Sequence, residues 1–466
     1  MTNTEPLALV SAYVEKVLGE YDHSLTFPGD EGFVIIYGPN GVGKTKFLEI
    51  LHAASQLKSR ELVALPFESA TLRYSDGTAL RIVNEGFHPR DFEPERASER
   101  ISQRLEYTLD VAGKRTERYT YTGEGLEEWI ILNTSWRPFE GELWEDQTDG
   151  EVIPLNVLER RYANRASTQL PPSSRSKIPN AFMTFSSRIP SFLIETQRLR
   201  IEQQSTARDR RTVTEWDPYI PASRRKKPPS SKITQQATKM RSLINEAQTE
   251  HSKITQQLDR TFPNRVLESS PYSSVEDAEV RNRYNEQNGF RSRLGPVASV
   301  ALEDALSLPD RQLLDWELQL LGLYLDDADK KLAPFETLLQ KIELLESIIN
   351  SRLLRKRIQV TASEGLKIIH DASGERIGLD SLSSGEQHEI ILVFDLLFNV
   401  PRGALVLIDE PEISLHIVWQ LAFIPDVQRI AELAGFRFVV ATHSPQIIND
   451  MWERAVRLGP PEAAFA

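Results

Sequence analysis

A glycine-rich segment near the start of the chain has the residue types and spacing of a phosphate-binding loop. Residues 38–45 read Gly-Pro-Asn-Gly-Val-Gly-Lys-Thr. Glycines let backbone N–H groups approach phosphate oxygens, and a helix that follows the loop points its positive end at them. We expect Lys44 at the β- and γ-phosphates of ATP and the Thr45 hydroxyl on Mg²⁺. The loop residues predicted to surround the nucleotide are Gly38, Asn40, Gly41 and Gly43.

The flanking residues favour this interpretation over a glycine-rich turn that binds nothing. Residues 32–37 form a short apolar, β-rich run, and residues 46–54 have helical periodicity. A strand, a loop and a helix in this order are the structural context that a phosphate loop requires.

Two carboxylates end an apolar run near the other end of the chain. Residues 404–408 are apolar and are followed by Asp409, Glu410 and Pro411. A buried parallel strand presents its last side chains at the edge of the sheet where ligands bind. We expect Asp409 to hold Mg²⁺, directly or through water, and Glu410 to orient and polarise the attacking water. The predicted reaction is therefore hydrolysis of the γ-phosphate of ATP.

A histidine and a glutamine follow two further strand-like runs. His443 comes after the apolar residues 438–441, and Gln197 follows the short run 191–195. A single histidine at a strand end is usually structural, but its place one helix-length segment after Glu410 favours a contact with the γ-phosphate. Gln197 fits a Mg²⁺ ligand and an ordinary polar residue at a strand end equally well.

Residues 382–386 read Leu-Ser-Ser-Gly-Glu and precede an amphipathic helical segment. Such a turn leaves backbone N–H groups free at the start of the helix, which makes an anion site. We expect Ser383 to cap the helix and to donate to a γ-phosphate, with Gly385 beside it. The alternative is an ordinary serine cap with no ligand. The position between the phosphate loop and the Asp-Glu strand favours the phosphate contact.

These motifs, in this order, resemble the ABC-type ATPase heads of the SMC, RecF and double-strand-break-repair group. The resemblance covers residues 1–55 and 377–466, and Ser384 departs from the group's common Leu-Ser-Gly-Gly pattern. It implies a homodimer or higher homo-oligomer in which two heads enclose two ATP molecules. In that arrangement Ser383 contacts the nucleotide on the other subunit's phosphate loop.

A narrower resemblance links the same motifs to the ATPase subunits of anti-phage systems such as PARIS, Septu and some retrons. It rests on residues 381–389, 409–416 and 441–450. It implies a sensor or regulatory ATPase that controls a separate nuclease or toxin effector, with DNA or a phage protein as the trigger. His416 matches a histidine of that pattern, and it also fits a helix-cap or interface residue.

Composition limits the remaining classes of function. The chain has 466 residues, no cysteine and a net charge of −12, which excludes a cysteine zinc hook and argues against a generally basic nucleic-acid binder. Residues 205–232 are locally basic and fit either a phosphate-contacting loop or a solvated linker. No apolar run spans a membrane and no secretory signal is recognisable, so we expect a cytoplasmic protein with no membrane partner.

The pattern along the chain predicts an α/β head interrupted by a helical, coiled-coil-like insert. We predict a first ATPase lobe at 1–205, the insert at 206–356 and a second lobe at 357–466. Two hairpins, at 70–83 and 105–121, predict the antiparallel sheet that flanks the P-loop sheet in ABC-type heads.

The insert carries apolar residues at heptad spacing from Ile233 to Leu258, and Pro263 is expected to end that helix. Residues 264–300 look irregular, and a second helical block covers 310–353. A two-helix antiparallel arm and a packed helical subdomain fit these patterns equally well.

Three other functions remain to be weighed. The main alternative is a RecF- or SMC-like ATPase in DNA repair or chromosome maintenance, which a long coiled coil or a basic stripe would favour. A transporter ATPase does not have the long gap between residues 45 and 382. A fused nuclease is disfavoured because residues 444–466 are too few for a further domain and the middle shows no nuclease motif.

Overall fold

The structure is a computed structural model of the 466-residue chain. It describes residues 6–28, 32–85, 87, 104–112, 116–122, 130–131, 133–139, 143–148, 150–154, 157–158, 161–162, 178–195, 231–268, 276–298, 307–413 and 415–460.

The chain forms two compact units. Unit 1 contains Met1–Thr196, Pro401–Glu412 and Gly435–Ala466, and unit 2 contains Gln197–Val400 and Ile413–Ala434. The three-part division into two lobes and an insert stays a prediction.

A five-stranded sheet of parallel neighbours forms the centre of unit 1. Its strands, in spatial order, are β11 (Ser191–Glu195), β15 (Leu405–Asp409), β16 (Arg437–Thr442), β3 (Phe33–Tyr37) and β17 (Ala455–Arg457). All five residues of β15 are buried, which explains why this strand reads as a continuous apolar run. Because the strands are parallel, the ends of β3, β15 and β16 share one edge of the sheet.

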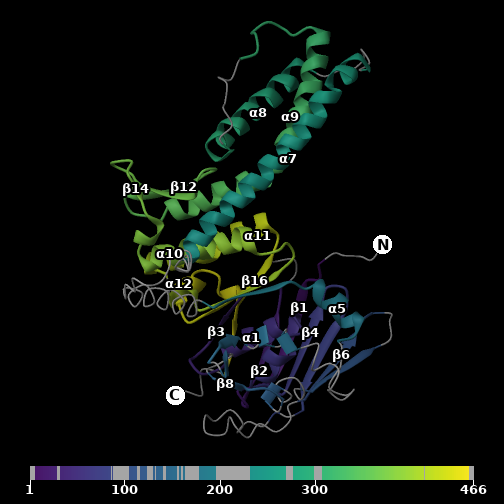
Figure 1. Ribbon diagram of the computed structural model, residues 1–466, viewed down its shortest axis with the longest axis vertical. Helices are drawn as coiled ribbons and strands as arrows, with labels where there is room; N and C mark the ends of the chain where they lie inside the picture. Colours follow the sequence, from purple (N-terminus) through teal and green to yellow (C-terminus); the bar gives the residue numbers. More distant parts are fainter. Residues whose placement is uncertain are drawn as a thin grey trace. The chain divides into compact units, whose positions relative to one another are not determined.

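A second sheet in unit 1 is antiparallel. Its strands, in spatial order, are β2 (Tyr21–Thr26), β1 (Leu9–Val17), β4 (Ser69–Tyr74), β5 (Ala79–Asn84), β6 (Arg104–Asp110) and β7 (Glu117–Thr122). The pairs β4–β5 and β6–β7 confirm the two predicted hairpins. Figure 1 shows these strands in purple and blue near α1.

Helix α1 (Lys44–Ser55) joins the two sheets of unit 1 into one hydrophobic core. Its buried residues Phe47, Leu48 and Leu51 belong to the same cluster as Val14 of β1 and Leu407 of β15. Two short helices, α2 (Ser59–Val63) and α5 (Asn180–Ser187), add Leu62, Phe182 and Phe185 to it. The position of α1 is therefore fixed by packing on both of its faces.

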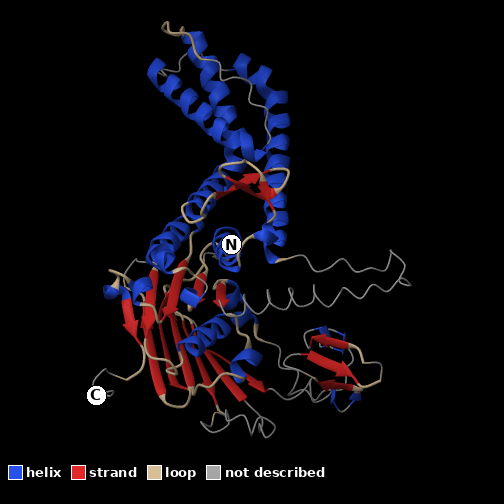
Figure 2. Ribbon diagram, turned by 90° about the vertical axis from the view of Figure 1, so that its left-hand side faces the viewer, coloured by secondary structure: helices blue, strands red, loops and turns tan. Residues whose placement is uncertain are grey.

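A small third sheet has its own core. It contains β8 (Trp136–Pro138), β9 (Leu143–Asp146) and β10 (Val152–Pro154), which are visible as three short red strands in Figure 2. Its buried residues are Ile130, Trp136, Trp144 and Leu158.

Three long helices dominate unit 2: α7 (Lys232–Glu268), α8 (Asp277–Ala298) and α9 (Asp315–Asn350) (Figure 1). Contacts of His251 with Lys331 and of Arg265 with Asp327 show that α7 and α9 run antiparallel. The predicted heptad residues Ile233, Ala237, Met240, Ile244 and Ala247 are buried. Because α8 packs beside α9, the described part of this region is a three-helix bundle.

The rest of unit 2 follows the bundle. A hairpin sheet contains β12 (Lys356–Thr361), β13 (Gly365–His370) and β14 (Arg376–Ile377). Helix α10 (Ser384–Phe394) continues into a π-helical turn at Asp395–Asn399, and α11 covers Ile417–Ala434.

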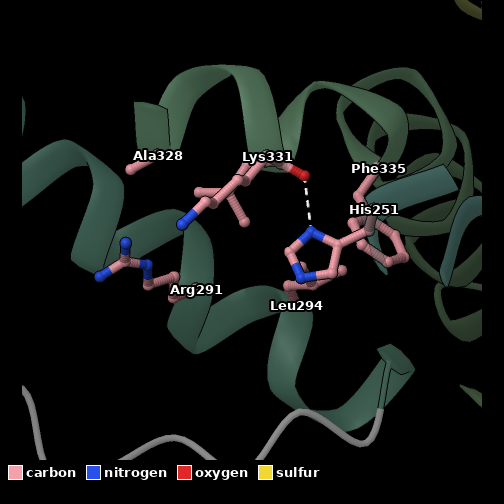
Figure 3. Close-up of a pocket in the computed structure, with 7 residues that line it drawn as sticks. His251, Arg291, Leu294, Ala328, Lys331 and Phe335 are labelled. Atoms are coloured by element: carbon pink, nitrogen blue, oxygen red, sulfur yellow. Dashed lines mark hydrogen bonds between the residues drawn. The ribbon is translucent and has the colours of Figure 1, made fainter. Parts of the chain in front are cut away.

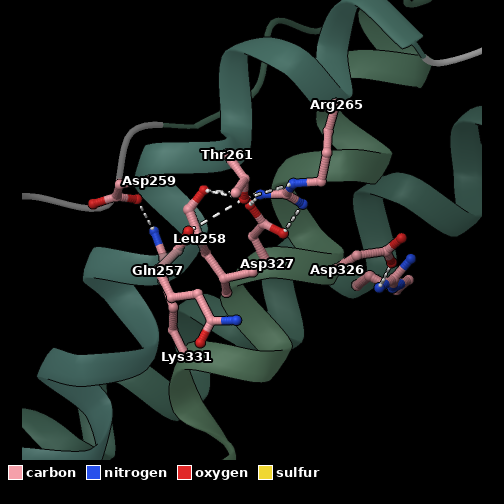
Figure 4. A network of polar contacts seen from close by, with 9 residues as sticks. Gln257, Leu258, Asp259, Thr261, Arg265, Asp326, Asp327 and Lys331 are labelled. Carbon is pink, nitrogen blue, oxygen red and sulfur yellow. Dashed lines mark hydrogen bonds and ion pairs between the residues drawn. The ribbon is translucent and has the colours of Figure 1, made fainter.

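The prediction that Pro263 ends its helix was wrong, as was the prediction of an irregular segment at 264–300. Helix α7 continues to Glu268, and α8 occupies much of the segment. Arg265 explains the continuation: its guanidinium bonds both carboxylate oxygens of Asp327 on α9, at 2.5 and 2.6 Å, and the Leu258 carbonyl at 3.0 Å (Figure 4). This ion pair fixes the last turn of α7 against α9 despite the missing proline N–H.

A small cavity of about 110 Å³ lies within the bundle, lined by residues of α7, α8 and α9 (Figure 3). His251 donates a hydrogen bond from Nδ1 to the Lys331 carbonyl at 2.6 Å, and Leu294 and Phe335 provide apolar walls. The cavity is much smaller than the space that a nucleotide needs.

Among the helices that the structure describes, none has the length and apolar character of a membrane span.

Candidate functional site

The segment between β3 and α1 has the backbone of a phosphate loop. Gly41 and Gly43 have φ values of +84° and +87°, which favour glycine. Gly43 is the N-cap of α1 and has no side chain that could cap the helix. The first N–H groups of α1 therefore face the loop uncapped. This arrangement offers backbone donors and the positive end of α1 to an anion.

Residues of the antiparallel sheet and of the turn after β1 contact this loop. A Cβ atom on Gly43 would lie 2.7 Å from Val17 Cγ1 and 3.3 Å from Leu18 Cδ1, so β1 approaches the loop closely. The buried His23 of β2 donates from Nε2 to the Val42 carbonyl at 2.7 Å. Burial lowers the pKa of His23, which keeps the ring neutral at pH 7.

Lys44 is buried inside the loop, with 5% of its surface exposed. Its ammonium donates to the carbonyls of Gly38 and Pro39 at 3.0 and 3.2 Å and also contacts His443 Nε2. Burial lowers the pKa of Lys44, and the carboxylates of Asp409, Glu410 and Glu412 oppose that shift. A cation thus lies where the loop would surround phosphate oxygens.

Thr45 and Asp409 bring two side-chain oxygen atoms close together. Thr45 Oγ1 donates a hydrogen bond to Asp409 Oδ2 at 2.8 Å. Asp409 ends β15 and is 7% exposed. A hydroxyl and a carboxylate are hard oxygen ligands, which fit Mg²⁺ when phosphate and water oxygens fill its other positions.

Glu410 and His443 extend from neighbouring strands toward each other. Glu410 donates its N–H to the Ala441 carbonyl at 2.8 Å and has a φ of +44°, which is uncommon for a residue other than glycine. Its Oε1 lies 3.3 Å from His443 Nε2. Burial and the Lys44 cation lower the pKa of His443 against the opposing effect of Glu410 and Glu412. The ring is therefore neutral at pH 7 and lies between a cation and a carboxylate.

Two residues of this site were missed by the reading of the sequence. Glu412 accepts a hydrogen bond from the backbone N–H of His443 at 2.6 Å, and His23 donates to the Val42 carbonyl. Glu412 belongs to the Asp-Glu-Pro-Glu run and could have been found there. His23 lies in an ordinary alternating strand that carries no signal of this role.

The remaining predicted residues belong to other parts of the chain. Ser383 and Gly385 belong to unit 2, where Ser383 caps α10. Gln197 lies outside the described residues. His416 precedes α11, with its ring centroid 5.9 Å from that of Trp419. The structure thus brings Lys44, Thr45, Asp409, Glu410 and His443 together.

A pocket of about 220 Å³ adjoins the loop. The residues that line it include Gly38, Pro39, His443, Tyr37 and Trp452. The two aromatic rings meet edge to face at 5.4 Å. The loop is thus open to a ligand on this side.

Comparisons with known proteins match most of the chain to one family. The model described as "AAA domain, putative AbiEii toxin, Type IV TA system" matches residues 33–449. The DNA replication and repair protein RecF of Chlorobium luteolum is 46% identical over 54 residues, which are 12% of this chain and 14% of that protein. The chain thus matches a small part of this relative's length.

Two solved structures of Smc heads were also found. One, from Pyrococcus furiosus, is a head domain with an extended coiled coil bound to the C-terminal domain of ScpA. It has 11% identity and a TM-score of 0.34, covering 95% of this chain and 91% of that one. The other is a head bound to the C-winged helix domain of ScpA, with 10% identity and a TM-score of 0.34, covering 97% and 94%.

The close approach of β1 to the loop predicts unequal effects of two glycine substitutions. Gly41→Ala and Gly43→Ala each place an L-residue at a positive φ, which costs about 1–2 kcal/mol. The added methyl group finds no atom within 4 Å at Gly41, whereas at Gly43 it collides with Val17. Gly43→Ala should therefore destabilise the protein by about 1–3 kcal/mol more than Gly41→Ala in thermal or chemical unfolding. Equal losses would show that β1 does not constrain the loop.

Proposed function

The chain belongs to the AAA-domain family described above, and we propose that it is a Mg²⁺-dependent ATPase that works as a homodimer or higher homo-oligomer. The observation that carries this proposal is the meeting of Lys44, Thr45, Asp409, Glu410 and His443 at one edge of the parallel sheet. A cation within a glycine loop, a hydroxyl–carboxylate pair and a second carboxylate are the groups that phosphoryl transfer to water requires.

In this proposal the loop and Lys44 bind the phosphates. The Lys44 ammonium now donates to the Gly38 and Pro39 carbonyls, and it would exchange these partners for β- and γ-phosphate oxygens. Gly38, Asn40, Gly41 and Gly43 supply the backbone around the phosphates. Thr45 and Asp409 would hold Mg²⁺, which would neutralise phosphate charge. Gln197 stays a proposed third ligand.

Glu410 is the proposed residue that polarises water. Its N–H is fixed by the Ala441 carbonyl and its backbone is held at a positive φ, so its carboxylate leaves the sheet in a defined direction. Strain of this kind persists where the surroundings impose it, and it often accompanies function. The neutral His443, 3.3 Å from Glu410, is the residue that we propose donates to a γ-phosphate oxygen and senses its loss.

Ser383 and Gly385 are proposed to serve the nucleotide bound to another subunit. They lie at the start of α10 in unit 2, whereas the phosphate loop and Glu410 lie in unit 1. Two subunits that each place Ser383 and Gly385 against the nucleotide on the other's phosphate loop would enclose two ATP molecules. Hydrolysis would then open the pair, and that motion would be the output.

The biological role that we propose is a sensor or regulatory subunit in anti-phage defence, acting in the cytoplasm on a separate nuclease or toxin. Support comes from the description of the matched family, which names a toxin and a toxin–antitoxin system. DNA or a phage protein would be the trigger. The 54-residue match to RecF supports a second candidate, an ATPase in DNA repair or chromosome maintenance.

Two substitutions test the assigned chemistry. Glu410→Gln should retain ATP binding and lower kcat by about 10²–10⁴-fold, because an amide does not polarise water as a carboxylate does. Lys44→Ala should lose nucleotide binding itself. Phosphate release and nucleotide retention measure both effects, and Glu453→Gln, an exposed carboxylate of the same unit, is the matched control. A Glu410→Gln protein that turns over at the wild-type rate would falsify the role of Glu410.

The biological role is tested by expressing the chain together with its genomic neighbour and challenging the cells with phage. Protection should require both genes and should vanish with Lys44→Ala. Full protection by the ATPase alone would exclude a separate effector. If deletion leaves phage growth unchanged and lowers survival after DNA damage, the repair role replaces the defence role.

A further inference from the structure

The hydroxyl of Ser383 is held by a carboxylate of its own helix. Glu386 Oε2 accepts hydrogen bonds from Ser383 N and from Ser383 Oγ, both at 2.9 Å, while Glu386 N donates to Ser383 Oγ at 3.3 Å. This reciprocal cap orders the first turn of α10. It also places a negative charge beside the point where the proposed function expects a phosphate.

Lys356 neutralises that carboxylate. Its Nζ donates to Glu386 Oε1 at 2.9 Å and to Oε2 at 3.1 Å, and the two side chains are 28% and 13% exposed. Partial burial raises the pKa of Glu386, but the bonds from Lys356 and Ser383 outweigh it, and the pKa is lowered overall. Glu386 is therefore ionised at pH 7 and paired with a cation.

Lys356 begins β12, and β12 is bonded to the end of the helical bundle. Asn350, the last residue of α9, donates to the Ile358 carbonyl at 3.1 Å and accepts the Ile358 N–H at 2.7 Å. One turn earlier, Glu346 Oε1 accepts the Val360 N–H at 2.6 Å. A displacement of the last turns of α9 therefore displaces Lys356.

The bundle also contacts α10 at two further points. The buried Arg352, just after α9, pairs with Glu389 of α10 and with Asp426 of α11. From the start of α7, Gln236 donates to Asp395 at 2.9 Å, directly after α10. The start of α7 and the end of α9, which lie at the same end of the antiparallel pair, thus both contact α10 or the turn that directly follows it.

We propose that Lys356 is a positioning residue for ATP hydrolysis, which links the helical bundle to Ser383 through Glu386. This inference rests on the proposed function of Ser383 toward the nucleotide of another subunit. With Lys356 in place, the Glu386 charge is compensated and the Ser383 hydroxyl can turn its proton to an incoming phosphate. Without it, the unpaired carboxylate retains that proton and repels the phosphate. A partner that binds the bundle and shifts α9 would change turnover through the same contact.

Steady-state ATPase assays on Lys356→Met, Lys356→Arg and Lys367→Met test the proposal. Lys367 lies on the neighbouring strand β13, opposite Gln359, and is the matched control. Lys356→Met should lower kcat about tenfold while nucleotide affinity stays at the wild-type value, because the phosphate loop is intact. Lys356→Arg should restore most of the rate, and Lys367→Met should leave it unchanged.

A double-mutant cycle separates positioning from simple stabilisation of α10. In a Glu386→Gln background no charge needs compensation, so adding Lys356→Met should change kcat less than twofold. An equal tenfold loss in both backgrounds would overturn the proposed route through Glu386. So would a Lys356→Met protein with wild-type kcat.

Ser383→Ala distinguishes failure of this inference from failure of the proposed function. If Ser383→Ala is impaired and Lys356→Met is not, only the positioning role of Lys356 is wrong. If Ser383→Ala itself turns over at the wild-type rate, the role of Ser383 in hydrolysis is wrong, and the positioning role with it.

Discussion

The hydrogen bond from Thr45 Oγ1 to Asp409 Oδ2 joins residues 364 positions apart in the chain. It exists because β16 lies between β3 and β15, and all three strands run in the same direction. A parallel arrangement brings their last residues to one edge, and the phosphate loop begins at that same edge. Every proposed hydrolytic group depends on this register: Asp409 pairs with Ala441, and Ala441 in turn fixes the backbone of Glu410.

Packing on both sides makes this register rigid. All five residues of β15 are buried, and Phe47, Leu48 and Leu51 pack α1 into the core that it shares with the parallel and antiparallel sheets. The antiparallel sheet contributes to the site as well as to the core, because Val17 meets Gly43 and His23 holds Val42. Unit 2 is organised differently, around a three-helix bundle of which one end, where α7 starts and α9 ends, contacts α10. In the proposed mechanism, the groups that hydrolyse ATP are therefore positioned by the packed sheets of unit 1. The serine that completes the site is positioned by the helices of unit 2.

The sequence predicted the parts of the structure that follow from local pattern. The phosphate loop, the two apolar strands ending in Asp409 and Thr442, and the hairpin at 70–83 all have short-range signals that the structure matches. The continuation of α7 through Pro263 could not be predicted, because it depends on an ion pair between Arg265 and Asp327, 62 positions away. Lys356 and His23 carry no pattern either, since their roles arise from which strands and helices lie together. Gln197 falls outside the described residues, so its predicted role gains no geometric support.

Each proposed ATP site combines Lys44 of one subunit with Ser383 of another. Lys44→Ala and Ser383→Arg proteins, each inactive alone, provide the most direct measurement when they are mixed. A mixed dimer carries one doubly damaged site and one intact site. Random pairing should therefore restore up to about a quarter of the wild-type ATPase rate. The absence of any recovery, with mixed dimers shown to form, would contradict the shared site.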